Sequence, residues 1–192
     1  MKRLFATLIL TLLPAFVMAA TIGDDGLHKQ DWMRDTFKDL TEDLAEANAE
    51  GKRLVVMVEQ RGCIYCTKMH EEVFSRANVA SYIRDNFFVV QVNLHGDTEL
   101  TDFDGETLSE KQAARKWGLL FTPSILFLPE EVEAGATAQS AAVALMPGAF
   151  GAGTTLDMFT WVNEKRYGAD FDEDFQRYHA RRIQERQDGT TD

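Results

Sequence analysis

Two cysteines, Cys63 and Cys66, are the residues of this 192-residue chain whose type and spacing most clearly indicate chemistry. The chain has no other cysteine, and two residues separate this pair. A disulfide between them would close a very short loop, so it would constrain the unfolded chain little and stabilise the fold little. Reversible oxidation explains the pair better than stability does. We therefore predict a redox-active disulfide, Cys63–Cys66.

The flanking residues predict where the pair lies. The run from Arg53 to Glu59 is rich in β-branched residues and indicates a buried strand, whereas the residues after Cys66 continue a helical face. Cys63 then stands at the N-terminus of a helix, where free N–H groups and the helix dipole stabilise a thiolate, and Arg61 adds positive potential. A thiolate is the attacking species in disulfide exchange. This predicts Cys63 as the nucleophile and Cys66 as the resolving thiol.

Other roles for a close cysteine pair fit less well. A structural zinc site needs four ligands, usually with a second close pair that this chain lacks. A haem attachment site needs histidine directly after Cys66, where Thr67 stands. A copper chaperone stays an alternative, because Cu(I) prefers soft thiolates; its third ligand would be His70 or His95. The favoured interpretation needs no metal and no cofactor.

Apolar runs and helical periodicities alternate along the chain. Strands are predicted over 53–59, 87–94, 124–128 and 141–146. Helices are predicted over 31–50, with Phe37 in the apolar stripe, over a stretch capped by Ser75, and over 110–117, 155–167 and 171–187. Helices between the early strands and two late strands close in sequence indicate an α/β fold. We expect a mixed sheet flanked by helices on both faces.

A later proline completes a pattern found in a known family. A strand, a CxxC pair at a helix start and a Thr-Pro dipeptide before a later strand, here Thr122-Pro123, together resemble thioredoxin. The resemblance implies a thioredoxin-like fold with a cis proline beside the cysteine pair. The segments EQRGCIYCTKMHEEVF, TDFDGETLSEKQAARKWG and TPSILFLPEE are more closely similar to the periplasmic thioredoxins of bacterial sulfur oxidation, the SoxW-like proteins. The similarity covers roughly residues 31–167.

This resemblance implies an exported thiol–disulfide oxidoreductase that reduces protein disulfides. Its partners would be protein disulfide substrates, among them a component of sulfur oxidation. A membrane thiol transporter of the CcdA or SoxV type would be its electron donor. An oxidase or isomerase for folding proteins stays an alternative, because the dipeptide between the cysteines does not decide the direction of electron flow.

Several positions depart from thioredoxin and affect the chemistry. Gly62 stands where thioredoxin has a tryptophan before the first cysteine, and Ile64-Tyr65 replace Gly-Pro. Met57 occupies the position of thioredoxin's buried aspartate. The proton acceptor for the resolving thiol must therefore be another group. Glu59 at the predicted strand end is our candidate, with a solvated strand-terminal charge as the alternative.

The first residues predict export. Lys2 and Arg3 precede an apolar run over 4–16, and small residues follow it, which is the pattern of a cleaved secretory signal peptide over 1–19. The run is short of the roughly 20 residues that a membrane-spanning helix needs, although an uncleaved anchor stays the alternative. We therefore expect a periplasmic protein without stable membrane insertion.

The remaining chain divides into three parts. We expect a linker over 20–30, a thioredoxin-like domain over 31–167 and a charged C-terminal helix and tail over 168–192.

The charge of the chain limits its partners. Acidic residues outnumber basic ones by 31 to 20, which disfavours a nucleic-acid partner because phosphate binding needs a basic face. The acidic stretch over 95–110 lacks the spacing of a calcium loop, so we expect a solvated loop, with a partner-docking loop as the alternative.

Overall fold

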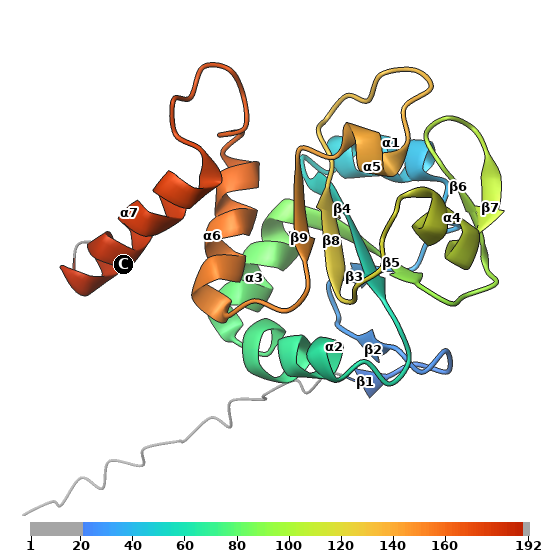
Figure 1. Cartoon of the computed structure of the whole chain (residues 1–192), viewed down its shortest axis with the longest axis horizontal. Coiled ribbons are helices and arrows are strands. Elements are labelled where there is room, and N and C mark those ends of the chain that lie inside the picture. Colours follow the sequence, from blue (N-terminus) through green and yellow to red (C-terminus); the bar gives the residue numbers. More distant parts are fainter. Residues whose placement is uncertain (1–20, 190–192) are drawn as a thin grey trace, which may run out of the picture.

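A five-stranded sheet forms the centre of the molecule in the computed structural model, which describes residues 21–189. Across the sheet (Figure 1), the strands follow the order β3 (Met33–Arg34), β5 (Phe87–Asn93), β4 (Arg53–Glu59), β8 (Ser124–Phe127) and β9 (Ala144–Pro147). β3, β5 and β4 run parallel, whereas β8 is antiparallel to β4 and β9 is antiparallel to β8. The predicted mixed sheet is therefore confirmed.

The central strand β4 is buried along its whole length, with β5 on one side and β8 on the other. Successive side chains of a strand point to opposite faces of the sheet. Val55 and Met57 accordingly enter one core cluster, while Leu54 and Val56 enter the other. Burial on both faces explains why β4 is almost continuously apolar, and it places Glu59 at the end of a rigid element.

Helices cover both faces of the sheet, as the sequence predicts (Figure 1). One core cluster joins the sheet to α2 (Ile64–Met69), the π-helical turn η1 (His70–Phe74), α3 (Ala77–Asn86) and α6 (Ala152–Asn163). The other joins it to α1 (Leu40–Ala49), α4 (Glu110–Lys116) and the short α5 (Ala138–Ala141). The last helix, α7 (Phe175–Gln187), lies outside these layers against α6.

The predicted helix over 31–50 is wrong in its first half. The observed helix, α1, begins at Leu40, because the Asp39 side chain caps it by accepting hydrogen bonds from two backbone N–H groups of the first turn, at 3.0 and 3.1 Å. Lys38 before the cap has a φ of +59°, which no α-helix continues through. The preceding residues instead form β3, and Phe37 is 96% exposed rather than part of an apolar stripe.

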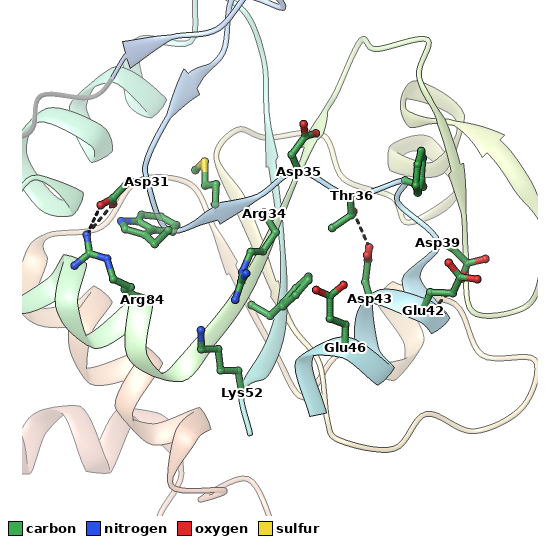
Figure 2. A pocket seen from close by; sticks show the side chains of 14 residues that line it. Asp31, Arg34, Asp35, Thr36, Asp39, Glu42, Asp43, Glu46, Lys52 and Arg84 are labelled. Carbon is green, nitrogen blue, oxygen red and sulfur yellow. Dashed lines mark hydrogen bonds and ion pairs between the residues drawn. The ribbon is translucent and has the colours of Figure 1, made fainter. Parts of the chain in front are cut away.

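The segment before α1 and the helix itself line a polar pocket of about 750 Å³ (Figure 2). In this pocket the Thr36 hydroxyl donates a hydrogen bond to the Asp43 carboxylate at 3.2 Å, which ties the segment to the helix. Asp43 is only 3% exposed. Burial raises the pKa of Asp43 to about 6, against the opposing effect of the Thr36 hydrogen bond, and neighbouring carboxylates raise it further.

The stretch predicted as a polar loop over 95–109 contains a hairpin of β6 (Glu99–Thr101) and β7 (Thr107–Ser109). Asp102, at the turn between these strands, is fully buried. Its carboxylate accepts hydrogen bonds from the Trp117 indole and from the Ala138 backbone N–H, both at 2.8 Å. The expectation of a solvated loop is therefore wrong for this part, because an acidic side chain serves there as an internal acceptor.

Further element boundaries differ from those predicted. The helix predicted over 155–167 is α6, at Ala152–Asn163, and the helix predicted over 171–187 is α7, which begins at Phe175. The N-cap of α3 is Arg76, whereas the predicted cap Ser75 ends η1. The last strand begins at Ala144 rather than at 141, because residues 138–141 form α5. Thr137 caps that short helix, and its side chain accepts a hydrogen bond from the Ser140 backbone N–H.

The N-terminal part of the described chain is folded onto the domain. β1 (Thr21–Ile22) and β2 (His28–Lys29) form an antiparallel hairpin within the span predicted as a linker. The predicted signal peptide over 1–19 lies outside the described residues. Within residues 21–189, no helix has both the length and the hydropathy needed to cross a membrane.

Candidate active site

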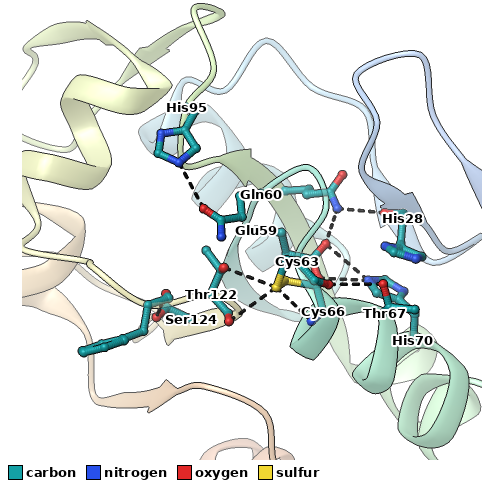
Figure 3. Close-up of a disulfide and its surroundings, with 12 residues drawn as sticks. His28, Glu59, Gln60, Cys63, Cys66, Thr67, His70, His95, Thr122 and Ser124 are labelled. Atoms are coloured by element: carbon teal, nitrogen blue, oxygen red, sulfur yellow. Dashed lines mark hydrogen bonds and ion pairs between the residues drawn. A yellow bond between two sulfur atoms is a disulfide. The ribbon is translucent and has the colours of Figure 1, made fainter.

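The cysteine pair lies where the chain leaves β4 and enters α2. Gly62 turns the chain with a φ of +71°, a conformation that glycine adopts without steric cost. Cys63 then occupies the N-cap of α2, and its Sγ accepts a hydrogen bond from the Cys66 backbone N–H at 2.9 Å. The two cysteines form the predicted disulfide (Figure 3), with Cα atoms 5.2 Å apart.

Thr122 and Pro123 lie directly beside this disulfide. The antiparallel pairing of β4 with β8 brings the start of β8 to the end of β4 that leads to the cysteines. The Thr122 hydroxyl donates a hydrogen bond to Cys63 Sγ at 3.3 Å, and the Thr122 carbonyl oxygen lies 3.5 Å from the same sulfur (Figure 3). The Thr122–Pro123 peptide bond is cis, as the resemblance implies.

Both cysteines are buried, but Cys63, which is 5% exposed, borders a groove at the surface of the molecule. Cys63 lines a groove of about 850 Å³, which we call the redox groove. Its lining residues are Gln60, Gly62, Cys63, Ile64, Tyr65, Leu120, Phe121, Thr122, Pro147, Gly148 and Ala149. Cys66 is not among them and is 1% exposed. Of the two sulfurs, that of Cys63 therefore borders the groove, and its role as the nucleophile stays a prediction.

Large apolar side chains project around this groove. Ile64 is 73% exposed, Tyr65 58%, Leu120 77% and Phe121 68%. Leu120 and Phe121 do not emerge from the sequence as site residues, because they belong to no periodic element. Their position directly before the Thr-Pro dipeptide was the available signal, since that dipeptide was already expected beside the cysteines.

Glu59, the candidate proton acceptor, is buried and not solvated, so the alternative of a solvated strand-terminal charge is wrong. Its side chain is 1% exposed. One carboxylate oxygen lies 3.0 Å and the other 3.2 Å from His70 Nε2, and the Gln91 side-chain N–H₂ donates to the carboxylate at 2.5 Å. Its role toward Cys66 stays a prediction.

The two histidines considered as copper ligands have other partners. His70 is fully buried, and while its Nε2 faces Glu59, its Nδ1 lies 3.1 Å from the Gln30 side-chain nitrogen. His95 Nε2 lies 3.0 Å from the Gln60 side-chain oxygen. In the part of the chain that the structure describes, no group of three or more His, Cys, Asp or Glu side chains is arranged to hold a metal ion.

Arg61 points to the N-terminal hairpin. Its guanidinium donates hydrogen bonds to the Asp25 carbonyl oxygen at 3.3 and 3.4 Å. A side chain at Gly26 would collide with this guanidinium, so the turn between β1 and β2 is shaped around it. The effect of Arg61 on the Cys63 thiolate stays a prediction.

Comparisons with known proteins agree with this architecture. The model of a family described as the thioredoxin-like domain matches residues 40–144, more than half of the chain. A thioredoxin-fold protein from Helicobacter pylori is 16% identical with a TM-score of 0.56, over 72% of this chain and 86% of that one. A thioredoxin from Thermus thermophilus is 24% identical with a TM-score of 0.51, over 69% and 88%. These two structures establish the shared fold, and no curated protein has a significant match.

Proposed function

Because the chain belongs to the thioredoxin-like domain family, we propose that it is a thiol–disulfide oxidoreductase that works through Cys63 and Cys66. The observation that carries this proposal is the setting of the Cys63 sulfur. It lies at the N-terminus of α2, receives hydrogen bonds from the Cys66 N–H and the Thr122 hydroxyl, and lines an open groove. A purely structural disulfide has no need of such a setting, since its short loop stabilises little.

The same two donors suit the reduced enzyme. A Cys63 thiolate accepts them as charge-assisted hydrogen bonds, and the N-terminus of α2 adds a favourable dipole. The thiolate attacks one sulfur of a substrate disulfide; that S–S bond breaks, and the departing substrate thiolate takes a proton from water. Cys66, after losing its proton, attacks Cys63 Sγ, forms the Cys63–Cys66 disulfide and releases the second substrate thiolate. Two electrons pass from the enzyme dithiol to the substrate.

The substrate class is protein disulfides. The exposed side chains of Ile64, Tyr65, Leu120 and Phe121 give the redox groove an apolar rim, which favours a polypeptide with apolar residues near its disulfide. Small charged disulfides would leave most of this rim exposed to water. The groove therefore supports a protein partner over a low-molecular-weight thiol.

The direction of electron flow and the location of the protein are proposed from the resemblance and from the first residues of the chain. We place the protein in the periplasm as a reductant, on the strength of the predicted signal peptide over 1–19 and the similarity to SoxW-like proteins over residues 31–167. Its electron donor would be a membrane thiol transporter of the CcdA or SoxV type, and a sulfur-oxidation component would be among its substrates. An oxidase or isomerase is the alternative, and a measured reduction potential distinguishes it from a reductant.

Reduction of insulin by the protein, with dithiothreitol as electron source, tests the proposal. We expect turbidity from precipitating insulin chains with the wild type and none above background with Cys63→Ser. Cys66→Ser should instead accumulate a covalent mixed disulfide, visible on a non-reducing gel and released by excess thiol. Activity that survives Cys63→Ser but is lost in Cys66→Ser would reverse the two roles. An inactive wild type with intact fold would refute the function.

A further inference from the structure

A buried polar network extends from β4 to the N-terminal hairpin. His70 and Glu59 form its centre, with the imidazole Nε2 at 3.0 and 3.2 Å from the two carboxylate oxygens. Gln91 of β5 donates to the same carboxylate and to the His28 carbonyl oxygen, and its own oxygen accepts from Lys29 at 2.6 Å. Burying polar groups costs free energy unless they are hydrogen-bonded to one another. Neither the fold nor the disulfide by itself explains why so many polar side chains are buried here.

The hydrogen bonds define which nitrogen of His70 carries a proton. The side-chain N–H₂ of Gln30 is a donor, so His70 Nδ1 accepts from it. Nε2 then holds the proton and donates it to Glu59. The His28 ring stacks on His70 with centroids 4.8 Å apart, and it covers the pair on the hairpin side.

Helix geometry relates this pair to the resolving cysteine. Cys66 and His70 stand four residues apart in one continuous helical run, and the His70 N–H donates to the Cys66 carbonyl. Side chains four residues apart lie on the same face of a helix, about 5–6 Å apart at Cβ. His70 faces the end of β4 and contacts Glu59, so the helix face that carries both His70 and Cys66 is turned to Glu59, while the Cys66 sulfur is bonded to Cys63 at the redox groove.

We infer that His70 is a positioning residue that orients Glu59 as the proton acceptor for Cys66, and that the N-terminal hairpin closes this pair against water. The inference rests on the proposed function. In the resolving step the Cys66 S–H bond breaks and its proton passes to the Glu59 carboxylate. The Cys66 thiolate then attacks Cys63 Sγ, the bond from Cys63 to the substrate sulfur breaks, and the substrate leaves with the electron pair of that bond.

The charges around the pair allow this role. His28 and Lys29 face it from β2, and Glu71 follows His70 in η1. Burial lowers the pKa of His28 below its usual value, so this ring is neutral at pH 7. Lys29 contacts the network only through Gln91 and is shared with Asp25 of the hairpin turn. Glu59 is therefore held by hydrogen bonds with His70 and Gln91 and not by a direct ion pair with Lys29.

Stopped-flow reaction of the reduced protein with Ellman's reagent separates the two steps. The first thionitrobenzoate reports attack by Cys63, and the second reports resolution by Cys66. We expect Glu59→Gln to slow the second phase roughly 100-fold and His70→Gln roughly tenfold at pH 7. In both variants the first phase should stay within about twofold of the wild type, and the second phase should require higher pH.

A double variant tests whether His70 acts through Glu59. We expect Glu59→Gln with His70→Gln to be no slower than Glu59→Gln alone, because the two substitutions remove one function. His179→Gln is the matched control, since Nδ1 of His179 on α7 pairs with the buried carboxylate of Asp157 on α6 at 2.6 Å. It should leave both phases unchanged.

Other outcomes would overturn the inference. An unchanged second phase in His70→Gln would do so, as would equal slowing of both phases or additive losses in the double variant. If His70→Gln does not fold, Gln30→Ala tests the inference instead. Gln30 is partly exposed, and its replacement removes the hydrogen-bond donor to His70 Nδ1. We expect this variant to slow only the second phase, by a few fold. A wild-type protein with no fast first phase would instead contradict the proposed function.

Discussion

At the sulfur of Cys63, one hydrogen-bond donor is local and the other is distant in sequence. The Cys66 N–H comes from the same helical turn, whereas the Thr122 hydroxyl lies 59 positions along the chain. We expect the helix start to supply part of the stabilisation of a Cys63 thiolate, and the paired strands β4 and β8 to supply the rest. Reactivity at this atom should then be a property of the folded domain and not of the CxxC segment alone.

Alkylation of the reduced protein by iodoacetamide measures this effect. The rate for Cys63 should rise with pH around a midpoint below the free-thiol value of about 8.5. Thr122→Val removes one donor, and Arg61→Ala removes a positive charge, so each should move the midpoint modestly upward. Thr67→Val is a suitable control, because the Thr67 hydroxyl donates to the Cys63 carbonyl oxygen and not to its sulfur. A wild-type midpoint at or above 8.5 would contradict the thiolate argument.

The short spacing of Cys63 and Cys66 was sufficient to predict their disulfide at the start of a helix. The position of Thr122 beside Cys63 was expected from the resemblance to thioredoxin, because 59 positions separate the two residues. The partners of Glu59 could not be found this way. They are Gln91 of β5 and His70 of η1, and Gln91 in turn donates to the His28 carbonyl oxygen of the N-terminal hairpin, 63 residues away. No periodicity in a sequence records contacts between residues so far apart.

Among the elements, α1 shows how a true periodicity can mislead. Met33, Phe37, Leu40 and Leu44 have helical spacing, yet only the last two are helical. The competing signal was Asp39, a favourable N-cap residue directly before the real helix. The strands β4 and β5 were predicted accurately, because burial on both faces makes their apolar runs unambiguous.

Asp43 of α1 makes a testable contribution to stability. Its pKa of about 6 in the folded protein exceeds the ordinary value of 3.8, so the folded state binds the proton more tightly than the unfolded state. The free energy of unfolding should therefore fall as pH rises from about 4 to 6. Asp43→Asn keeps an acceptor for Thr36 and should flatten this slope, raising stability at pH 7 by about 1–2 kcal/mol.

Urea unfolding of both proteins at pH 4, 5, 6 and 7 measures the difference. Asp85→Asn is the matched control, because Asp85 is an exposed carboxylate of α3 and is not among the neighbours that raise the pKa of Asp43, so it should leave the slope intact. Equal free energies of unfolding of the wild type and Asp43→Asn at pH 7 would show that the Asp43 carboxylate does not cause the loss of stability with rising pH.

For the whole molecule, the open question is the direction of electron flow. The setting of the disulfide fits both a reductant and an oxidant, because each needs an accessible Cys63. We expect a reductant, with a reduction potential near thioredoxin's roughly −270 mV. Equilibration of the Cys63–Cys66 disulfide in dithiothreitol redox buffers gives this value. A potential near −120 mV would instead favour the oxidase alternative.

The pairing of β4 with β8 also has a consequence for the nascent chain. Register partners such as Val55 and Phe127 must close a loop of dozens of residues before Thr122 meets Cys63. Loop closure of this kind costs entropy and comes late relative to local helix formation. An incompletely folded chain therefore carries cysteines that lack one of their two donors and the groove around them. We therefore expect the reactivity of Cys63 to reach its native value only after this long-range pairing has formed.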